Sequence, residues 1–552
     1  MYTWIFVTGI LFAFYNAWGG GANDCANSFA TAVGSNTLTL RNAIIIASIF
    51  EFSGAVLMGS HVTDAVRKNI VSEDLFTDNP GALMFGMLCA DLASALWLTL
   101  ATYLKWPVST THSIIGAIIG FSLAYGGEDG INWDKVGFIV LSWFVSPILA
   151  GLFSLTIFTT VKKFVFDTKN PYERTARIFP ILTFATFFIS SLFIIYKGSP
   201  QLDLDEMPAG ESVGISIGIA TGTGLISWFI YLPYAKKRIQ RSQETELELN
   251  NIEVYDNDDE NNKNDNNDDS NSIEKRTTSY VDAVEIDNTL DESQTDITNE
   301  TTTNDENESE DIVDESADKV DESADKVDES EDKVDESDET NTIEFYNNKI
   351  KELKKKQDEN LIQKLHDNAY VIDEKADKLC SWLQIFTSCF SSFAHGSNDV
   401  ANAVAPLATI YSIYQYNVVL EKTEVPIWIL VLGGAGIVLG LATWGYKIID
   451  RIGRELTKVS PSRGFIIELS AATTVIIASR TEMPVSTTHC QVGSVVGCGL
   501  AGGTKNVQWK LLKGILWSWF ITVPVTGLLS AGLFSYGYFS PSSFSSNTTY
   551  LG

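Results

Sequence analysis

The chain has 552 residues, 45% of them hydrophobic, and a formal net charge of −30. Residues 242–346 hold 39 Asp and Glu but only 6 Lys and Arg, so the rest of the chain is close to neutral and strongly apolar. This split excludes a uniformly acidic soluble protein and indicates a membrane protein with one polar insert. The six cysteines show no CxxC pair and no regular spacing, which argues against a disulfide framework or a zinc site.

Apolar runs long enough to cross a bilayer, about 20 residues each, recur along the chain and predict an all-α membrane protein. We predict about twelve transmembrane segments, at 2–34, 43–60, 82–104, 108–126, 136–161, 178–197, 213–235, 382–416, 425–446, 464–480, 485–502 and 514–536. The first run lacks a basic region before it and a cleavage site, so we expect a retained span. The segments 2–34 and 382–416 are long and carry Gly, Asn and Asp at their centres, which predicts broken helices.

Lysines and arginines in the short loops predict the orientation, because cytoplasmic loops are enriched in them. The loops 162–177 and 447–463 each carry five such bases, whereas 198–212 carries acids and no base. We therefore place the first two loops and the acidic insert in the cytoplasm, and both termini outside. A glycosylation sequon at Asn547, in the outside tail, agrees with this orientation.

Composition divides the chain into four regions: an N-terminal membrane region 1–235, an acidic low-complexity cytoplasmic loop 236–380, a C-terminal membrane region 381–540 and an outside tail 541–552. Within the loop, a seven-residue motif that begins at Asp314 recurs twice. Each heptad has one strong apolar residue, so no coiled-coil seam forms and we predict disorder. The loop is either a regulatory tail or a passive spacer, and we favour the spacer.

Two short motifs each occur twice in the apolar regions. NDCAN at 23–27 matches NDVAN at 398–402, and PVSTTH at 107–112 is identical to PVSTTH at 484–489. The first Asn precedes the Pro by 84 residues in one copy and by 86 in the other. Such matched spacing indicates an internal duplication.

The span count predicts how the two copies are oriented. Seven predicted spans precede the second copy, and because seven is odd the copies should be inverted, a common plan of secondary transporters. This parity places the first PVSTTH near the inner face and the second near the outer face. Asp91 and Glu468 occupy the same position in the two copies, 16 residues before the Pro.

An aspartate lies within a predicted span in each copy. An ionised Asp at the bilayer centre costs about 2.5–3.5 kcal/mol on insertion scales, so Asp24 and Asp399 both need partners. Neither motif contains a Lys or Arg, which makes metal cations the expected partners. Oxygen ligands from Asp, Asn and the backbone suit a hard ion such as Na⁺. We expect glycines 19–21 and Gly396 to help free backbone carbonyls for this ion.

The PVSTTH segments are suited to binding an anion instead of a cation. A Pro followed by Ser-Thr-Thr places hydroxyl groups and free N–H groups at the positive end of a helix, where anions bind. Two such ends, one from each copy, could converge on one tetrahedral anion. The alternative is that Ser-Thr-Thr only caps and packs a helix, which two identical copies at matched offsets disfavour.

The histidines leave their own alternatives open. His112 and His489 follow a serine by three residues, but neither copy has a GxSxG elbow or an evident orienting acid beside its His, so we predict that the chain is not an enzyme. Packing is at least as good an interpretation as proton transfer for both, and for His395.

The ordered motif set resembles the inorganic phosphate transporter (PiT) family, whose members couple phosphate transport to sodium or protons. The resemblance rests on GGANDCANSFATAVGS at 20–35, AHGSNDVANAVAPL at 394–407 and the two PVSTTH segments, and it does not include the acidic insert. It implies a secondary active symporter that imports inorganic phosphate with sodium across the plasma membrane. The alternatives are a proton-coupled phosphate transporter and a phosphate sensor. A channel fits the mixed anion and cation chemistry poorly.

The resemblance also implies roles for individual residues. Phosphate binding is implied for Asp24, Ser109, Thr110, Thr111, Asp399, Ser486, Thr487 and Thr488. Sodium binding is implied for Asn23, Asp24, Asn27, Asn398, Asp399 and Asn402. The further functional acids are Glu51, Asp91 and Glu468. The expected partners are phosphate, sodium ions and the lipid bilayer, with no cofactor and no nucleic acid, and a homodimer is left open.

Overall fold

The structure is a computed structural model that describes residues 2–60, 70–71, 73–197, 207–244, 362–420, 425–480 and 485–540, together with residues 349, 356 and 360. The heptad repeats, the sequon and the predicted disorder of the insert lie outside the described residues. The two apolar regions belong to one compact unit, 1–261 with 364–552.

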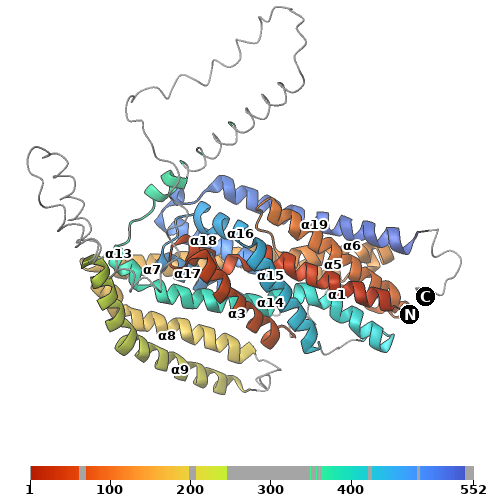
Figure 1. The fold of residues 1–552 in the computed structure, drawn as a ribbon, viewed down its shortest axis with the longest axis horizontal. Helices are drawn as coiled ribbons and strands as arrows, with labels where there is room; N and C mark the ends of the chain where they lie inside the picture. Colours follow the sequence, from red (N-terminus) through yellow and green to blue (C-terminus); the bar gives the residue numbers. More distant parts are fainter. Residues whose placement is uncertain are drawn as a thin grey trace, which may run out of the picture. The chain divides into compact units, whose positions relative to one another are not determined.

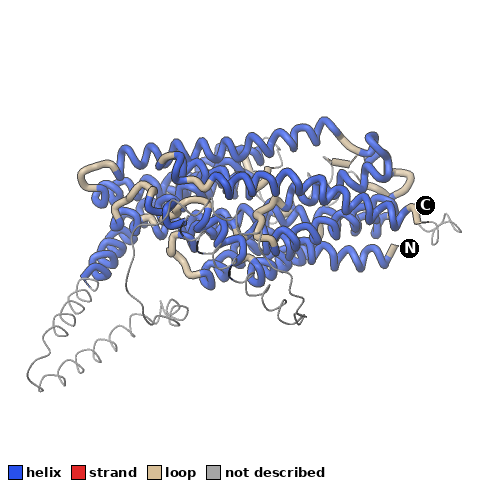
Figure 2. The backbone as a smooth tube through the Cα atoms, turned by 90° about the horizontal axis from the view of Figure 1, so that it is seen from above, coloured by secondary structure: helices blue, strands red, loops and turns tan. Residues whose placement is uncertain are grey.

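The prediction of an all-α membrane protein is confirmed. The first region contains α1 (Thr3–Gly20), η1 (Gly21–Cys25), α2 (Asn27–Gly34), α3 (Leu40–Met58), α5 (Pro80–Tyr103), α6 (Thr110–Gly126), α7 (Trp133–Val161), α8 (Pro171–Lys197) and α9 (Ala209–Ile226). The second contains α13 (Glu374–Leu379), α14 (Ser381–Tyr416), α15 (Ile427–Trp444), α16 (Tyr446–Asp450), η7 (Arg451–Glu455), α17 (Pro461–Arg480), α18 (Thr487–Gly502) and α19 (Trp509–Tyr538). Figure 2 shows these helices and the loops that join them.

Each of the twelve predicted spans coincides with one of these helical segments, and among the described residues 8 helices are long and apolar enough to cross a membrane. Their outward faces are apolar. On α19, Phe520 is 73% exposed and Leu528 is 75% exposed. Side chains of this kind on a membrane helix face lipid tails, which need no polar partner.

The helices of this unit have two distinct ends (Figure 1). At the end that we call the terminal end, the amide of Asn79 donates to the Tyr538 hydroxyl at 2.9 Å, and Phe6 stacks on Tyr414 with ring centroids 4.7 Å apart. At the opposite end, which we call the insert end, the hydroxyl of Ser35 donates to Gln384 Oε1 at 2.9 Å. The start of α1 and the end of α19 therefore lie at the same end of the unit.

Two helical hairpins enter the unit from opposite ends. Hairpin α5–α6 starts and finishes at the terminal end, where Val71 forms a bridge with Ile131 just after α6. Hairpin α17–α18 starts and finishes at the insert end, where the hydroxyl of Thr457 donates to the Asn506 carbonyl at 2.7 Å. The prediction of inverted repeats is confirmed. The placement of the two PVSTTH segments near opposite faces is wrong, because both hairpin tips reach the same buried cluster, described below.

The prediction of two broken helices is half right. Helix α1 continues into α2 through a π-helical turn, η1, so the first segment is interrupted at Gly21–Cys25. Helix α14 is continuous for 36 residues, so the predicted break is wrong there. Gly396 serves close packing instead of freeing a carbonyl, because a Cβ at this position would lie 2.2 Å from the Glu51 carbonyl oxygen.

The duplication extends into the packing of the hairpins. Helix α6 packs on α19 and helix α18 packs on α7, so each hairpin rests on a long helix of the other copy. A Cβ on Gly120 would lie 2.0 Å from the Gly527 carbonyl, and a Cβ on Gly497 would lie 2.1 Å from the Gly151 carbonyl. Small residues allow membrane helices to approach this closely. Because Gly120 and Gly497 occupy the same position after their PVSTTH segments, the two interfaces are copies of one contact.

Gly497→Ala should therefore lower the free energy of unfolding by about 1–3 kcal/mol, the usual range for overpacking. Thermal unfolding in detergent measures the change. Gly514→Ala on α19 is the matched control, because its new Cβ meets nothing within 4 Å and alanine is the better helix former. Equal melting temperatures for the two variants would show that the close contact between α18 and α7 is unimportant.

Candidate functional site

The two aspartates of the repeated motif lie in one buried cluster. Asp24 is in η1 and Asp399 is near the middle of α14, and their residues are 1% and 6% exposed. Each accepts a hydrogen bond from the asparagine three residues later. Asn27 Nδ2 lies 3.2 Å from Asp24 Oδ1, and Asn402 Nδ2 lies 3.1 Å from Asp399 Oδ1. The duplicated sequence thus gives a duplicated local geometry.

The hairpin tips bring the PVSTTH threonines to these carboxylates. The backbone N–H and the hydroxyl of Thr110 donate to Asp24 Oδ2 at 3.2 and 2.9 Å. In the other copy, the Thr487 hydroxyl donates to Asp399 Oδ2 at 2.6 Å. Both threonines are the first residues of their helices, so the positive helix ends favour the negative charge there.

Further contacts join the two copies into a single site. Asn402 Nδ2, from the second copy, donates to the hydroxyls of Thr110 and Thr111 at 2.9 and 3.1 Å. Asn27 Nδ2, from the first copy, donates to the Thr488 hydroxyl at 2.9 Å, and this hydroxyl also contacts Asp24. The structure therefore gathers four PVSTTH threonines and four residues of the Asn-Asp motifs around one centre: Thr110, Thr111, Thr487, Thr488, Asp24, Asn27, Asp399 and Asn402.

The serines of the two segments have a different position. Ser109 and Ser486 are N-caps, and their hydroxyl oxygens accept from the backbone N–H groups of His112 and His489 at 3.3 and 3.2 Å. The capping interpretation thus describes the serines, whereas Thr110, Thr487 and Thr488 reach the aspartates. The rings of His112 and His489 lie 4.4 Å apart, and His489 stacks on Trp519 at 3.7 Å, which fits the packing interpretation.

Asn23 holds the first hairpin tip in place. Its amide nitrogen donates to the Thr102 hydroxyl at 3.0 Å and to the Trp106 carbonyl at 2.9 Å, and its oxygen accepts from the Val108 N–H at 2.9 Å. Its amide is fully engaged in this conformation. Asn398, the same position in the second copy, is 9% exposed.

A histidine that the sequence did not assign to the site links three acids. His395 Nδ1 lies 2.9 Å from Glu51 Oε2, and His395 Nε2 lies 2.8 Å from Asp399 Oδ2 and 3.7 Å from Asp24 Oδ1. All four residues are buried. The available signal was the four-residue spacing of His395 and Asp399, which places them on one helix face.

The remaining predicted acids, Asp91 and Glu468, lie outside the aspartate cluster. Asn16 Nδ2 donates to Asp91 Oδ1 at 2.9 Å and to the Asn402 carbonyl at 3.3 Å. Glu468 Oε1 accepts from the Thr31 hydroxyl at 2.9 Å and from Gln491 Nε2 at 2.7 Å. Both acids are fully buried. Asn16 links Asp91 to Asn402 of the site, and Gln491, the partner of Glu468, lines a small cavity with Asn27 and Thr487.

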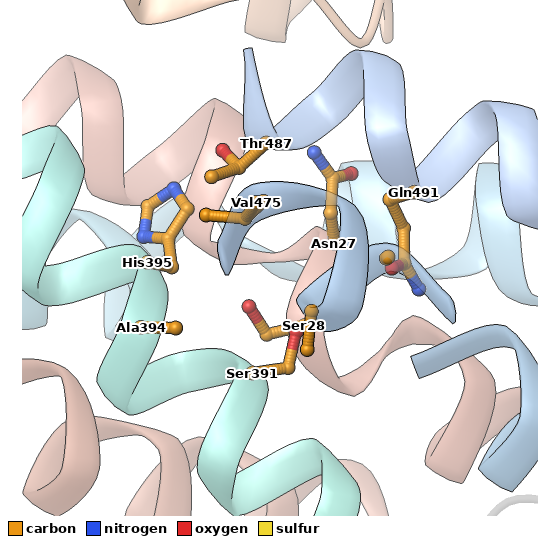
Figure 3. Close-up of a pocket in the computed structure, with 10 residues that line it drawn as sticks. Asn27, Ser28, Ser391, Ala394, His395, Val475, Thr487 and Gln491 are labelled. Atoms are coloured by element: carbon orange, nitrogen blue, oxygen red, sulfur yellow. The ribbon is translucent and has the colours of Figure 1, made fainter. Parts of the chain in front are cut away.

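Two small cavities, lined by both polar and apolar side chains, flank the cluster. One, of about 20 Å³, is lined by residues that include Asn27, Ser391, His395 and Thr487 (Figure 3). The other, of about 10 Å³, is lined by Asn16, Gly20, Thr110, His395, Asp399 and Asn402 among others. Asn27 with Asn402, and Thr487 with Thr110, are equivalent residues of the two copies. The cavities are thus related by the repeat, and each is about the size of one water molecule.

The carboxylates of Asp24, Glu51 and Asp399 give the buried cluster a negative charge that bound cations would compensate. Three carboxylates lie around one imidazole, so even a protonated His395 would leave a net charge of −2 if all three are ionised. Among the described residues, every ion pair of Asp24, Glu51 and Asp399 is with this histidine. Buried charge of this size is costly unless it is paired. The carboxylate and amide oxygens of the cluster can hold a hard cation. The hydroxyl and N–H groups at the two helix ends can hold an oxyanion.

Comparison with known proteins identifies the family of this chain. The model of the phosphate transporter family matches residues 20–530. Sodium-dependent phosphate transporter 1 from Rattus norvegicus is 32% identical over 96% of this chain and 95% of its own length. Sodium-dependent phosphate transporter 2 from Xenopus laevis is 34% identical over 96% of this chain and 97% of its own.

A solved structure, described as "The sodium-dependent phosphate transporter", matches with a TM-score of 0.67 and 29% identity over 97% of this chain and 99% of that chain. The match spans both apolar regions, both copies of each motif and the helices that carry them. The chain therefore belongs to the phosphate transporter family.

Proposed function

We propose that this chain is a secondary active symporter that imports inorganic phosphate together with sodium across the plasma membrane. Two helix ends, whose threonine hydroxyls donate to two aspartates from inverted copies, share one buried cluster, and this juxtaposition carries the proposal. Relatives named sodium-dependent phosphate transporters support sodium as the coupling ion. The basic loops favour a cytoplasmic insert and termini outside the cell.

Phosphate would bind at the hairpin tips. In this conformation the hydroxyls of Thr110 and Thr487 donate to Asp24 and Asp399. Phosphate offers the same acceptor chemistry and could take these donors, joined by Thr111, Thr488 and, with a change of their capping contacts, Ser109 and Ser486. A protonated phosphate oxygen could in turn donate to a carboxylate.

Sodium would bind beside the phosphate, on the same carboxylates. Asn27 and Asn402 each supply an amide oxygen next to an aspartate, and Asn23 and Asn398 lie one residue before it. A cation at each aspartate would remove the repulsion between the carboxylates and phosphate, which links the binding of the two solutes. Glu51, Asp91 and Glu468 would tune this site through His395, Asn16 and Thr31.

Proton drive is the second candidate, and one observation favours it. His395 lies between Glu51 and the two aspartates, so it could pass a proton among them. Such a role would couple phosphate movement to a proton gradient instead of a sodium gradient.

Radiolabelled phosphate uptake by the purified full chain in proteoliposomes tests transport itself. A transporter accumulates phosphate inside the vesicles when a sodium gradient is imposed. A protein that binds phosphate but never moves it would be a sensor, and the proposal would be wrong.

Deletion of residues 245–345 should leave uptake per molecule nearly unchanged, because this acidic segment cannot bury a core. The rate per molecule, measured with purified protein in proteoliposomes, separates turnover from trafficking. A charge-preserving scramble of the same segment is the matched control. A large loss of turnover on deletion, restored by the scramble, would assign the insert a role in transport.

A further inference from the structure

We propose that Cys25, Glu51 and His395 form a site for a thiophilic divalent cation such as Zn²⁺ or Cd²⁺, and that metal bound there blocks transport. The three side chains each offer one ligand atom, and these atoms lie within 4.8 Å of one another. All three residues are buried. The site is distinct from the oxygen-only chemistry proposed for sodium, because one of its ligands is a thiol.

The chemistry of the donor set selects the kind of metal. Thiolate, imidazole and carboxylate are the ligands that hold Zn²⁺, at about 2.0–2.3 Å, in many proteins. A sulfur ligand adds little for a hard ion such as Na⁺ but favours softer ions such as Cd²⁺. Metal binding would displace the proton of the Cys25 thiol. The ligand atoms would need only a small closing movement to reach one ion.

One carboxylate oxygen of Glu51 is available to bind such a metal ion. Its Oε2 pairs with His395 Nδ1 at 2.9 Å, whereas its Oε1 has no N–H or O–H partner among the described residues. The Cys25 thiol faces the same carboxylate. A buried carboxylate oxygen that meets no N–H or O–H group among the described residues, beside a thiol and an imidazole, is the arrangement that a metal completes.

The second copy of the repeat lacks this ligand set. Val400 stands at the position of Cys25, and Gly20 stands at the position of His395. The sequence therefore contains this ligand set once. Val400, the residue equivalent to Cys25, provides a control position in the other copy. His395 also contacts Asp24 and Asp399. An ion that holds His395 and Glu51 to Cys25 would therefore fix the aspartate cluster in one arrangement and stop the transport cycle.

The test uses cadmium alone as the probe on the purified full chain. Equilibrium dialysis should detect bound cadmium, together with the ultraviolet charge-transfer band of a cadmium thiolate. Cys25→Val should retain uptake, lose the thiolate band, and raise the cadmium concentration for half-inhibition at least tenfold, since even outer partners of a metal ligand contribute 10–100-fold. Cys25→Ala serves the same purpose if valine perturbs packing.

Two controls make the outcome specific. Cys490→Ala removes another buried thiol and should keep the cadmium sensitivity. Val400→Cys in the Cys25→Val background returns a thiol at the equivalent position of the other copy and should not restore it. The proposal is overturned if wild type binds no cadmium, or if wild type and Cys25→Val bind it equally. The inhibition assay rests on the proposed transport function, whereas the binding assay does not, so the two can fail separately.

Discussion

Replacing external sodium with choline should reduce phosphate uptake by the reconstituted protein at least a hundredfold at fixed pH. The reason is the charge of the buried cluster, in which Asp24, Glu51 and Asp399 share one histidine. Each uncompensated ion in a membrane interior costs about 2.5–3.5 kcal/mol, and phosphate adds more negative charge. Two missing cations would thus weaken phosphate binding by more than a hundredfold. Choline is too large for cavities of about 10 and 20 Å³.

The control separates sodium drive from proton drive. Uptake is measured with equal ionic strength inside and outside, once with a sodium gradient and once with an imposed proton gradient. Uptake that persists in choline and follows the proton gradient would show that the sodium assignment is wrong and that His395 is the better candidate for coupling.

The repeated motifs made much of the site predictable. Identical PVSTTH segments at matched distances from Asn-Asp pairs require two equivalent structures, and an inverted arrangement follows from the order of apolar runs. The contacts of Thr110 with Asp24 and of Thr487 with Asp399 show this equivalence directly. The twelve helical segments that match the predicted spans were predictable for a simpler reason, since each contains a long apolar run.

Contacts without a local sequence pattern were not predictable. His395 and Glu51 are 344 residues apart, and their pairing depends on how α3 crosses α14. The continuity of α14 was missed because a glycine can either interrupt a helix or admit a neighbouring backbone. Gly396 does the second, and only the position of the Glu51 carbonyl decides between the two.

The meeting of the hairpin tips also needed tertiary information. Counting α5 and α6 as two ordinary spans gives the correct parity but places the turn between them at a membrane face. The hydrogen bonds of Asn402 to Thr110 and Thr111 place that turn beside the second copy instead. Length and hydropathy cannot make this distinction, because a hairpin and two spans have the same composition.

Asp24→Asn and Asp399→Asn should each lower phosphate affinity more than a hundredfold in the presence of sodium. Both oxygens of Asp24 accept hydrogen bonds, Oδ1 from Asn27 and Thr488 and Oδ2 from the N–H and hydroxyl of Thr110. An asparagine amide group would face donors in either orientation. It would also lose the charge that holds sodium. With phosphate bound, each carboxylate would hold sodium and accept from a protonated phosphate oxygen, and loss of two such charge-assisted contacts, at about 1.5–3 kcal/mol each, is enough for this effect.

Equilibrium binding of radiolabelled phosphate to the purified variants measures these affinities, and thermal unfolding confirms that each variant is folded. Asp450→Asn is the control, because this acid lies outside the site and its side chain is 55% exposed. Asn27 and Asn402 each join a threonine of the opposite copy to the cluster. Both aspartate variants should therefore lose phosphate affinity. Normal phosphate affinity in one folded variant and loss in the other would mean that a single copy binds phosphate and that the shared site does not exist.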